Sequence, residues 1–247
     1  MFTGIATWFD GVKAEFTLNF IDKSRWKLLL SGLENTLIIT FFALIIGIVL
    51  GVIIATVRTT WDKNELSMRR GAGRTCLKLG DMLCRLYTTV IRGTPVVIQL
   101  MIMYYIIFAS SDNGVLIAIF AFGLNSGAYV SEIFRGGILS IDKGQFEAGR
   151  SLGLSYVQTM LRIIAPQVLK TVLPTLANEF IVLIKETSVA GYVAVMDLTF
   201  AGNRIRGVTY SAFMPLIAVA LIYLIMVMFF TWLVGKLERR LRQGDNR

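Results

Sequence analysis

The sequence predicts an all-α integral membrane protein with about five transmembrane helices, on three observations. Hydrophobic residues make up 55% of the 247-residue chain, and the mean hydropathy is +0.66, which is more apolar surface than a soluble domain covers. These residues gather into five apolar runs. The Lys and Arg residues, which give a net charge of +9, are distributed unequally between the two sides of those runs.

Each apolar run approaches the ~20 residues that a helix needs to cross the hydrocarbon core. We therefore expect a transmembrane domain over residues 33–247. Asn35 and Thr36 fit a helix cap at the start of the first run. The runs cover residues 33–57, 86–109, 115–133, 168–184 (or on toward 195) and 213–233.

Two pairs of glycines have the G-x-x-x-G spacing that lets helices pack closely in a membrane, Gly47 with Gly51 and Gly123 with Gly127. Residues 1–32 mix aromatic and basic side chains and contain no apolar core run. They are expected to form an N-terminal arm, either an amphipathic helix at the membrane surface or a partly ordered segment, and not a removable signal peptide.

The basic residues predict the orientation of the chain in the membrane. Eighteen of the 25 Lys and Arg residues lie in segments 58–92, 135–170 and 236–247, and seven lie in the segments that face the other way. Because cytosolic segments carry the excess of Lys and Arg, the N-terminus is expected outside and the C-terminus in the cytosol. Residues 58–83 are then expected to form a cytosolic loop, either solvated or in contact with anionic lipid headgroups or a partner protein. The charge does not indicate nucleic-acid binding.

Several kinds of chemistry are excluded by the residues that the chain lacks. It has no His, which excludes a His-based catalytic triad, a His-ligated zinc and a His proton shuttle. Cys76 and Cys84 are eight residues apart, a spacing that matches no metal or redox motif. No G-x-x-x-x-G-K-[ST] phosphate-binding loop occurs. We expect no metal, no cofactor bound by this chain and no enzymatic site.

Residues 142–167, DKGQFEAGRSLGLSYVQTMLRIIAPQ, predict a helix, a glycine turn and a second helix. Asp142 and Ser155 are each followed three residues later by Gln, as in a capping box. Gly153 lies between them, where a helix end needs a left-handed residue. Pro166 is expected to stop the second helix because it has no N–H to donate.

This stretch resembles the EAA loop of bacterial ABC importer permeases, E-A-A, three residues, G, nine residues and I-x-L-P. Gly149 replaces the third Ala and Ala165 replaces Leu, and both replacements predict weaker helix propensity, not lost function. The resemblance implies that the hairpin, with Phe146 as an apolar anchor, docks on a separate ATPase. An ordinary helical hairpin or a DNA-reading helix pair would show similar local signals. The matching residues are Glu147, Ala148, Gly149, Gly153, Ile163 and Pro166.

Three further stretches resemble the permeases for polar amino acids within the ABC importers, of the histidine, glutamine and arginine type. They are RGTP at 92–95 followed by Gln99, A-Y-x-x-E-x-x-R-G-G-I at 128–138, and N-E-F at 178–180 followed by K-E-T-S at 185–188. Glu132 and Arg135 are three residues apart, so they share a helix face and can form a structural ion pair.

Polar side chains inside apolar runs are candidates for the substrate path, because such groups face protein or a wet cavity and not lipid. Gln99 fits substrate contact or a bond to a neighbouring helix equally well. Lys185 and Glu186 carry the two charges that an amino-acid zwitterion needs, although they also fit an interfacial position where they bond each other or water. The candidates are Gln99, Asn178, Glu179, Lys185, Glu186, Thr187 and Ser188.

The resemblance implies a type I ABC importer permease, a multi-pass protein of the bacterial inner membrane that carries a polar amino acid. It implies as partners a second permease subunit, identical or related, two ATPase subunits that bind ATP and Mg, and an extracytoplasmic amino-acid-binding protein. An ion-coupled secondary transporter is the main alternative, and an intramembrane enzyme is a second. The transported amino acid and the choice between a homodimer and a heterodimer stay open.

Overall fold

The computed structural model of the chain describes residues 10–65, 68 and 71–243, and these residues contain helices and connecting turns but no strand. Residues 10–16 are helical. The later elements, with η marking 3₁₀ and π segments, are η1 (Thr17–Ile21), η2 (Asp22–Ser24), α2 (Trp26–Asn64), α3 (Ala72–Gly93), α4 (Val96–Ile102), η3 (Met103–Ile107), α5 (Gly114–Leu139), α6 (Lys143–Ser151), α7 (Tyr156–Thr159), η4 (Met160–Ile164), α8 (Ala165–Glu186), η5 (Thr187–Val193), α9 (Leu198–Thr209) and α10 (Phe213–Gln243).

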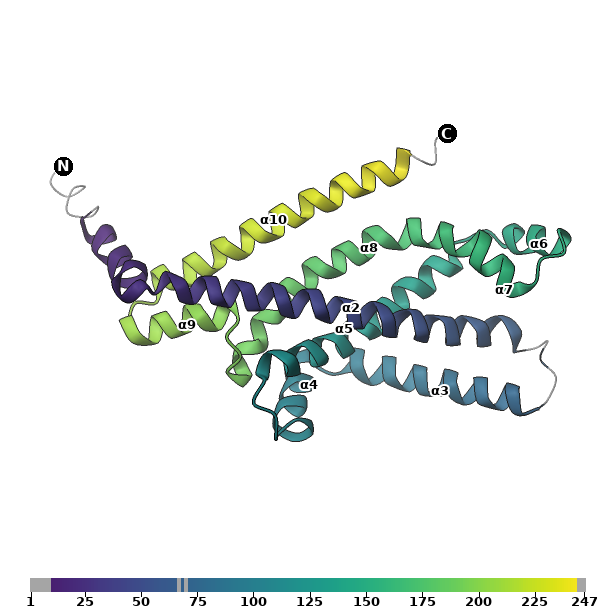
Figure 1. Cartoon of the computed structure of the whole chain (residues 1–247), viewed down its shortest axis with the longest axis horizontal. Coiled ribbons are helices and arrows are strands. Elements are labelled where there is room, and N and C mark those ends of the chain that lie inside the picture. Colours follow the sequence, from purple (N-terminus) through teal and green to yellow (C-terminus); the bar gives the residue numbers. More distant parts are fainter. Residues whose placement is uncertain (1–9, 66–67, 69–70, 244–247) are drawn as a thin grey trace.

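The long helices lie lengthwise through the molecule, and α2 extends over most of its long axis (Figure 1). The C-terminal end of α2 lies at the same end of the molecule as α6 and α7, which we call the hairpin end. Its N-terminal end packs against α9, and we call this the α9 end. The expected N-terminal arm, residues 1–32, lies partly outside the described residues, and its place at a membrane surface stays a prediction.

Within the described residues, four helices are long and apolar enough to cross a membrane, and the number is five if one bent pair of helices is counted as a single span. The bent pair joins Ala72–Gly93 to Val96–Ile107 at an angle of 108°. The apolar run 86–109 is therefore divided between two helices, since α3 ends at Gly93 and α4 begins at Val96, directly after Pro95. Thr94 is extended, at φ −120° and ψ 146°, because the residue before a proline avoids the helical region.

The expected loop over residues 58–83 was wrong, since α2 continues to Asn64 and α3 begins at Ala72. No proline lies between 58 and 64 to end the helix. At its other end α2 begins at Trp26, so Asn35 lies inside the helix and does not cap it. The helix is longer than the apolar run because charged residues at both of its ends can stay helical while their charged groups reach water.

The glycine motifs bring α2 and α5 into close contact, as the sequence predicts. A Cβ atom added at Gly47 would lie 2.7 Å from Ser126 Oγ, and one added at Gly51 would lie 2.5 Å from Val130 Cγ1. On the facing helix, a Cβ at Gly123 would lie 2.8 Å from Ile46. Small residues on both helices therefore allow their backbones to approach, and α2 packs along α5 as the central helix pair of the bundle.

Candidate functional site

The segment 142–167 folds as a helix, a turn and a second helix at the hairpin end (Figure 1). Asp142 caps α6 by accepting from the Gly144 N–H at 2.5 Å, but the reciprocal bond of a capping box is absent there. Gly153 has a φ of +76°, the left-handed conformation that its position predicted. Ser155 and Gln158 form the complete capping box at the start of α7. The local turn chemistry of the hairpin is thus confirmed, apart from the box at Asp142.

Pro166 does not stop the second helix, which corrects the sequence-based expectation. The chain stays helical from Tyr156 to Val193. Pro166 lies in the first turn of α8, directly after the π segment Met160–Ile164. A wider helical turn before the proline makes room for its ring and for the missing N–H. The second helix of the hairpin is therefore continuous with the membrane span α8.

Gly149 explains how the two helices of the hairpin come together. A Cβ atom added at this position would lie 2.6 Å from both Cγ2 and Oγ1 of Thr159, a distance that real Cβ contacts essentially never show. Thr159 is buried, and its hydroxyl has no hydrogen-bond partner. The Thr159 side chain of α7 therefore occupies the space that the methyl group of an Ala at position 149 would need.

Aromatic side chains continue this contact toward α2. The rings of Phe146 and Tyr156 stack with their centroids 6.4 Å apart. The Lys63 ammonium, at the end of α2, lies 3.3 Å from the centroid of the Phe146 ring. A cavity of about 720 Å³ opens beside these groups. Its walls carry three cations and one carboxylate and are formed by Lys63, Lys143, Phe146, Glu147, Arg150, Leu154, Tyr156 and Thr159.

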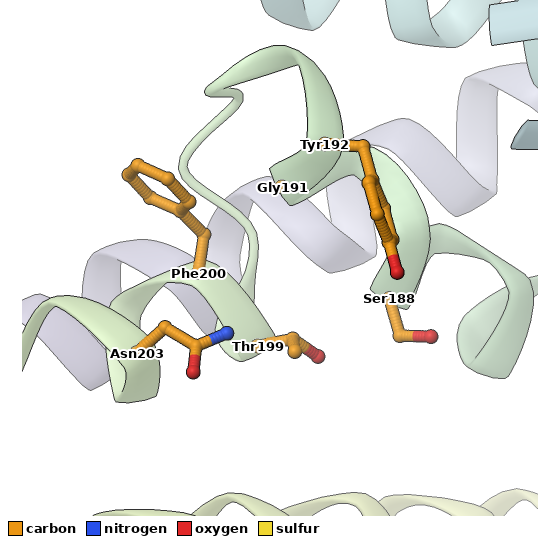
Figure 2. Close-up of a pocket in the computed structure, with 6 residues that line it drawn as sticks. All are labelled: Ser188, Gly191, Tyr192, Thr199, Phe200 and Asn203. Carbon is orange, nitrogen blue, oxygen red and sulfur yellow. The ribbon is translucent and has the colours of Figure 1, made fainter. Parts of the chain in front are cut away.

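A second cavity, of about 250 Å³, lies at the α9 end between η5 and α9. Tyr192 and Ser188 line one side from η5, and Phe200, Thr199 and Asn203 line the other from α9, as Figure 2 shows. Gly191 completes the wall. Hydroxyl, amide and aromatic groups with no formal charge surround this space, so it suits a small polar molecule. Only Ser188 of these residues was a candidate from sequence, because the others come from a segment without a recognisable motif.

The wall of the α9 cavity is positioned by Asp197, the N-cap of α9. Its carboxylate accepts from the backbone N–H groups of Thr199 at 2.9 Å and Phe200 at 3.0 Å. Burial raises the pKa of the Asp197 carboxyl, and these hydrogen bonds act in the opposite direction. The buried cap holds the first turn of α9, and with it Thr199 and Phe200, two of the three α9 residues that line the cavity.

The chain matches the model of a known protein family over residues 72–243, the binding-protein-dependent transport system inner membrane component. It is 34% identical to the arginine transport system permease protein ArtQ of Bacillus subtilis over 88% of this chain and 94% of that protein. It is 35% identical to the glutamine transport system permease protein GlnP of Escherichia coli K12, over 87% and 93% of the two chains.

The chain belongs to this family. It is a membrane-embedded permease subunit of an ABC transport system of the inner membrane. A crystal structure of an amino acid ABC transporter with histidines matches the permease with a TM-score of 0.77 and 36% identity, over 90% of this chain and 98% of the other. An inward-facing methionine transporter, MetNI, matches with a TM-score of 0.72 at 21% identity, a likeness of fold.

Within the permease, Gln99 holds the bend between α3 and α4. Its Nε2 donates to the carbonyls of Ile91 at 2.7 Å and Thr94 at 3.1 Å, and Asn125 of α5 donates to its Oε1 at 3.0 Å. These are carbonyls that the break in the helix leaves without their usual partners. Of the two roles that the sequence left open for Gln99, the structure displays the bond to a neighbouring helix.

The other polar candidates are spread over α8 and η5 and do not form one cluster. Glu179 accepts from Ser126 Oγ at 2.9 Å, which ties α8 to α5. Thr187 is buried and donates to the carbonyl of its own helix at Ile184. Glu186 is half-buried, whereas Asn178 and Lys185 are exposed. Ser188 is the candidate that reaches the α9 cavity. Within the described ranges, no group of three Cys, Asp or Glu side chains could hold a metal ion.

The predicted ion pair of α5 is confirmed and is larger than expected. Arg135 Nη2 lies 2.9 Å from Glu132 Oε2, three residues earlier in the helix. Arg58 of α2 also pairs with Glu132, through the other carboxylate oxygen. The spacing of residues in the sequence can predict a contact within one helix. It could not predict Arg58 as a partner of Glu132, because the two residues are 74 positions apart. The cluster fastens α2 to α5 nearer the hairpin end than their glycine contacts.

Proposed function

We propose that this permease forms the membrane path of an ATP-driven importer for a polar amino acid, and that residues 142–167 dock on a separate ATPase subunit. The observation that carries the proposal is the hairpin, which carries the EAA-like residues and has a capped, exposed turn at the end of the span α8. The relatives named as arginine and glutamine permeases support the substrate class.

The surface of the hairpin has the chemistry of a docking element. Glu147 and Ala148 are exposed on α6, and Leu152 at the turn is 77% exposed. Val157 and Leu161 on the second helix are also exposed. An apolar tip bordered by charge at the end of a span is suited to a protein groove, where the apolar groups supply affinity and the charges fix orientation.

The division of labour follows from the lack of a phosphate-binding loop in this sequence. ATP and Mg bind to the partner, and this chain contributes no ATPase site. We infer an assembly of two ATPase subunits, a second permease that is identical or related, and an extracytoplasmic amino-acid-binding protein. The hairpin end then faces the cytosol and the α9 end faces outward, which agrees with the excess of Lys and Arg in the segments at the hairpin end.

The substrate path passes the α9 end of the bundle in this proposal. The uncharged cavity beside Ser188 offers hydroxyl and amide groups for a polar side chain. Lys185 and Glu186, one turn earlier along the chain, supply a cation for the carboxylate of an amino acid and an anion for its ammonium group. Glu179 lies deeper along α8, where it is bonded to Ser126.

Co-purification with the native partners tests the proposal. The tagged permease is extracted from its own membrane, and ATPase turnover is measured with each of a panel of amino acids and with any co-expressed binding protein. An ATPase partner whose turnover rises with one polar amino acid is the expected result, and it identifies the substrate. A well-folded permease with no partner and no ATPase activity would support an ion-coupled secondary transporter.

A further inference from the structure

One turn of α2 holds both helices of the hairpin. The Lys63 ammonium lies 3.3 Å from the centroid of the Phe146 ring on α6. The side chain of Thr60, three residues earlier on the same face of α2, interacts with Tyr156 of α7. Because Phe146 and Tyr156 also stack on each other, these four side chains form one connected unit, which we call the α2 clamp.

The opposite end of α2 holds the segment that begins α9. Asn35 Nδ2 donates to the carbonyl of Met196 at 2.8 Å, and the Leu198 N–H donates to Thr36 Oγ1 at 3.1 Å. Gly32 lies against Asp197 so closely that an added Cβ would be 2.6 Å from its carbonyl oxygen. The first turn of α9, which carries Thr199 and Phe200 into the cavity, is therefore fastened to α2.

These two attachments lie on one uninterrupted helix of 39 residues. At 1.5 Å per residue, Thr36 and Thr60 are about 36 Å apart along its axis. The helix contains no proline, and its close packing on α5 at Gly47 and Gly51 stiffens it. A helix of this kind transmits a tilt or a shift from one end to the other without local unfolding.

We propose that Lys63 and Thr60 are positioning residues for energy coupling, which hold the hairpin on α2 so that α2 carries its displacement to the α9 cavity. The inference rests on the proposed docking of the hairpin on an ATPase. It adds a second route to the direct connection of α7 with α8, and it assigns a role to two residues that lie outside the EAA-like motif. Coupling of this kind requires that both sites bias one shared element, and α2 is that element.

The test uses the complete complex with its native ATPase, reconstituted in lipid. Lys63→Met removes the charge and keeps most of the side-chain volume, whereas Lys63→Arg keeps a cation for the ring. Lys78→Met is the matched control, because Lys78 is an exposed lysine of α3. Each variant is assayed for ATPase co-purification, basal ATPase turnover and stimulation of turnover by the amino acid.

A distance measurement between η5 and α9 detects directly whether the α9 end changes its structure. Nitroxide labels are placed at Tyr192→Cys and Arg206→Cys, on η5 and α9, in a background where Cys76 and Cys84 are replaced by Ser. Pulsed electron paramagnetic resonance compares the nucleotide-free complex with the complex trapped by ATP and vanadate. We expect the distance distribution to change fully between these states with Lys63, Lys63→Arg or Lys78→Met, and to change less with Lys63→Met, because the direct connection through α8 remains.

The activity assays are expected to divide in the same way. Lys63→Met reduces amino-acid stimulation of the ATPase by about 5-fold or more, while the partner still co-purifies and basal turnover is unchanged. Thr36→Val, at the other end of α2, reduces stimulation similarly, and the double variant is no worse than either single one because both interrupt the same connection.

Three results would overturn the inference: a normal distance change with Lys63→Met, no change in the complex that has Lys63, or loss of the ATPase partner from Lys63→Met, which would make Lys63 a docking residue only. Failure of the proposed function is distinguishable from all three. In that case the unaltered permease has no ATPase partner, and this is known before any variant is compared.

Discussion

The two ends of α2 are attached to the rest of the permease by different kinds of contact. At the α9 end, buried side chains bond to backbone groups, as Thr36 does to the N–H of Leu198. At the hairpin end the contacts join side chains to one another, with the Lys63 ammonium over the ring of Phe146. Hydrogen bonds to a buried backbone are directional, whereas stacking and cation–π contacts tolerate tilting. The comparison indicates a fixed joint at α9 and an adjustable joint at the hairpin.

Gly32→Val should have the largest effect on stability, because it adds a side chain where α2 packs against the start of α9. Its Cβ would lie 2.6 Å from the Asp197 carbonyl oxygen and 2.9 Å from Ala201 Cβ, and neither neighbour can swing away. Overpacking of this kind costs about 1–3 kcal/mol. Thermal unfolding in detergent measures it, with Gly207→Val as control, since a Cβ there meets nothing within 4 Å. Equal melting temperatures would mean that the α9 joint is not rigid.

Thr36→Val tests the same joint without adding volume. The substitution keeps the shape of the side chain but removes the acceptor of the buried Leu198 N–H. An unsatisfied buried donor costs about 1–3 kcal/mol, and both Thr36 and Leu198 are fully buried. Amide hydrogen exchange over residues 198–205 should quicken while exchange in α10 is unchanged. Thr56→Val, at an exposed threonine of α2, is the matched control.

At the hairpin, Gly149→Ala should impair packing although the family motif has Ala at this place. The added methyl would lie 2.6 Å from Thr159 Cγ2, and its cost exceeds the ~1 kcal/mol that Ala gains over Gly in helix propensity. The double substitution Gly149→Ala with Thr159→Ala removes the clash and should restore transport. Uptake assays on both variants decide this. Normal uptake by the single variant would show that the hairpin helices separate easily.

Ser155→Ala should have the smallest effect, because it loosens only one turn of the hairpin. It removes the oxygen that accepts from the Gln158 N–H in the capping box. The loss is about 1 kcal/mol of local stability. Proteolysis or hydrogen exchange at residues 155–159 should detect it, and Ser155→Asp, which keeps a capping oxygen, should behave as the natural residue does. An unchanged exchange rate would mean that α7 is stabilised by its stacking on α6 and not by the cap.

The hairpin could be predicted from sequence because its signals are local. Gly153 takes the left-handed conformation that its position required, and Ser155 caps the helix that follows it. The effect of Pro166 was misjudged, because a π segment absorbs the missing hydrogen bond and propensity rules describe regular helices.

The α9 end could not be predicted, because its contacts join residues far apart in the chain. Threonine is a residue type that often caps a helix. In the structure, however, the Thr36 hydroxyl accepts a hydrogen bond from the backbone N–H of Leu198, 162 residues away. Asn203 and Phe200 lie in a segment with no motif, and only the folding of η5 against α9 makes them neighbours of Ser188. The orientation of the bundle and the residues of the substrate path stay predictions.

Uptake of labelled amino acids into membrane vesicles shows whether the hairpin couples transport to ATP, when the permease and its Glu147→Lys variant are compared. Glu147 is exposed on the hairpin and lines its cavity, so reversing its charge should leave membrane insertion intact and prevent productive docking. We predict ATP-dependent uptake of one polar amino acid by the permease and none by the variant. Equal uptake by both would mean that the hairpin does not dock on an ATPase, and uptake driven by an ion gradient without ATP would mean that the permease is not part of an ATP-driven importer.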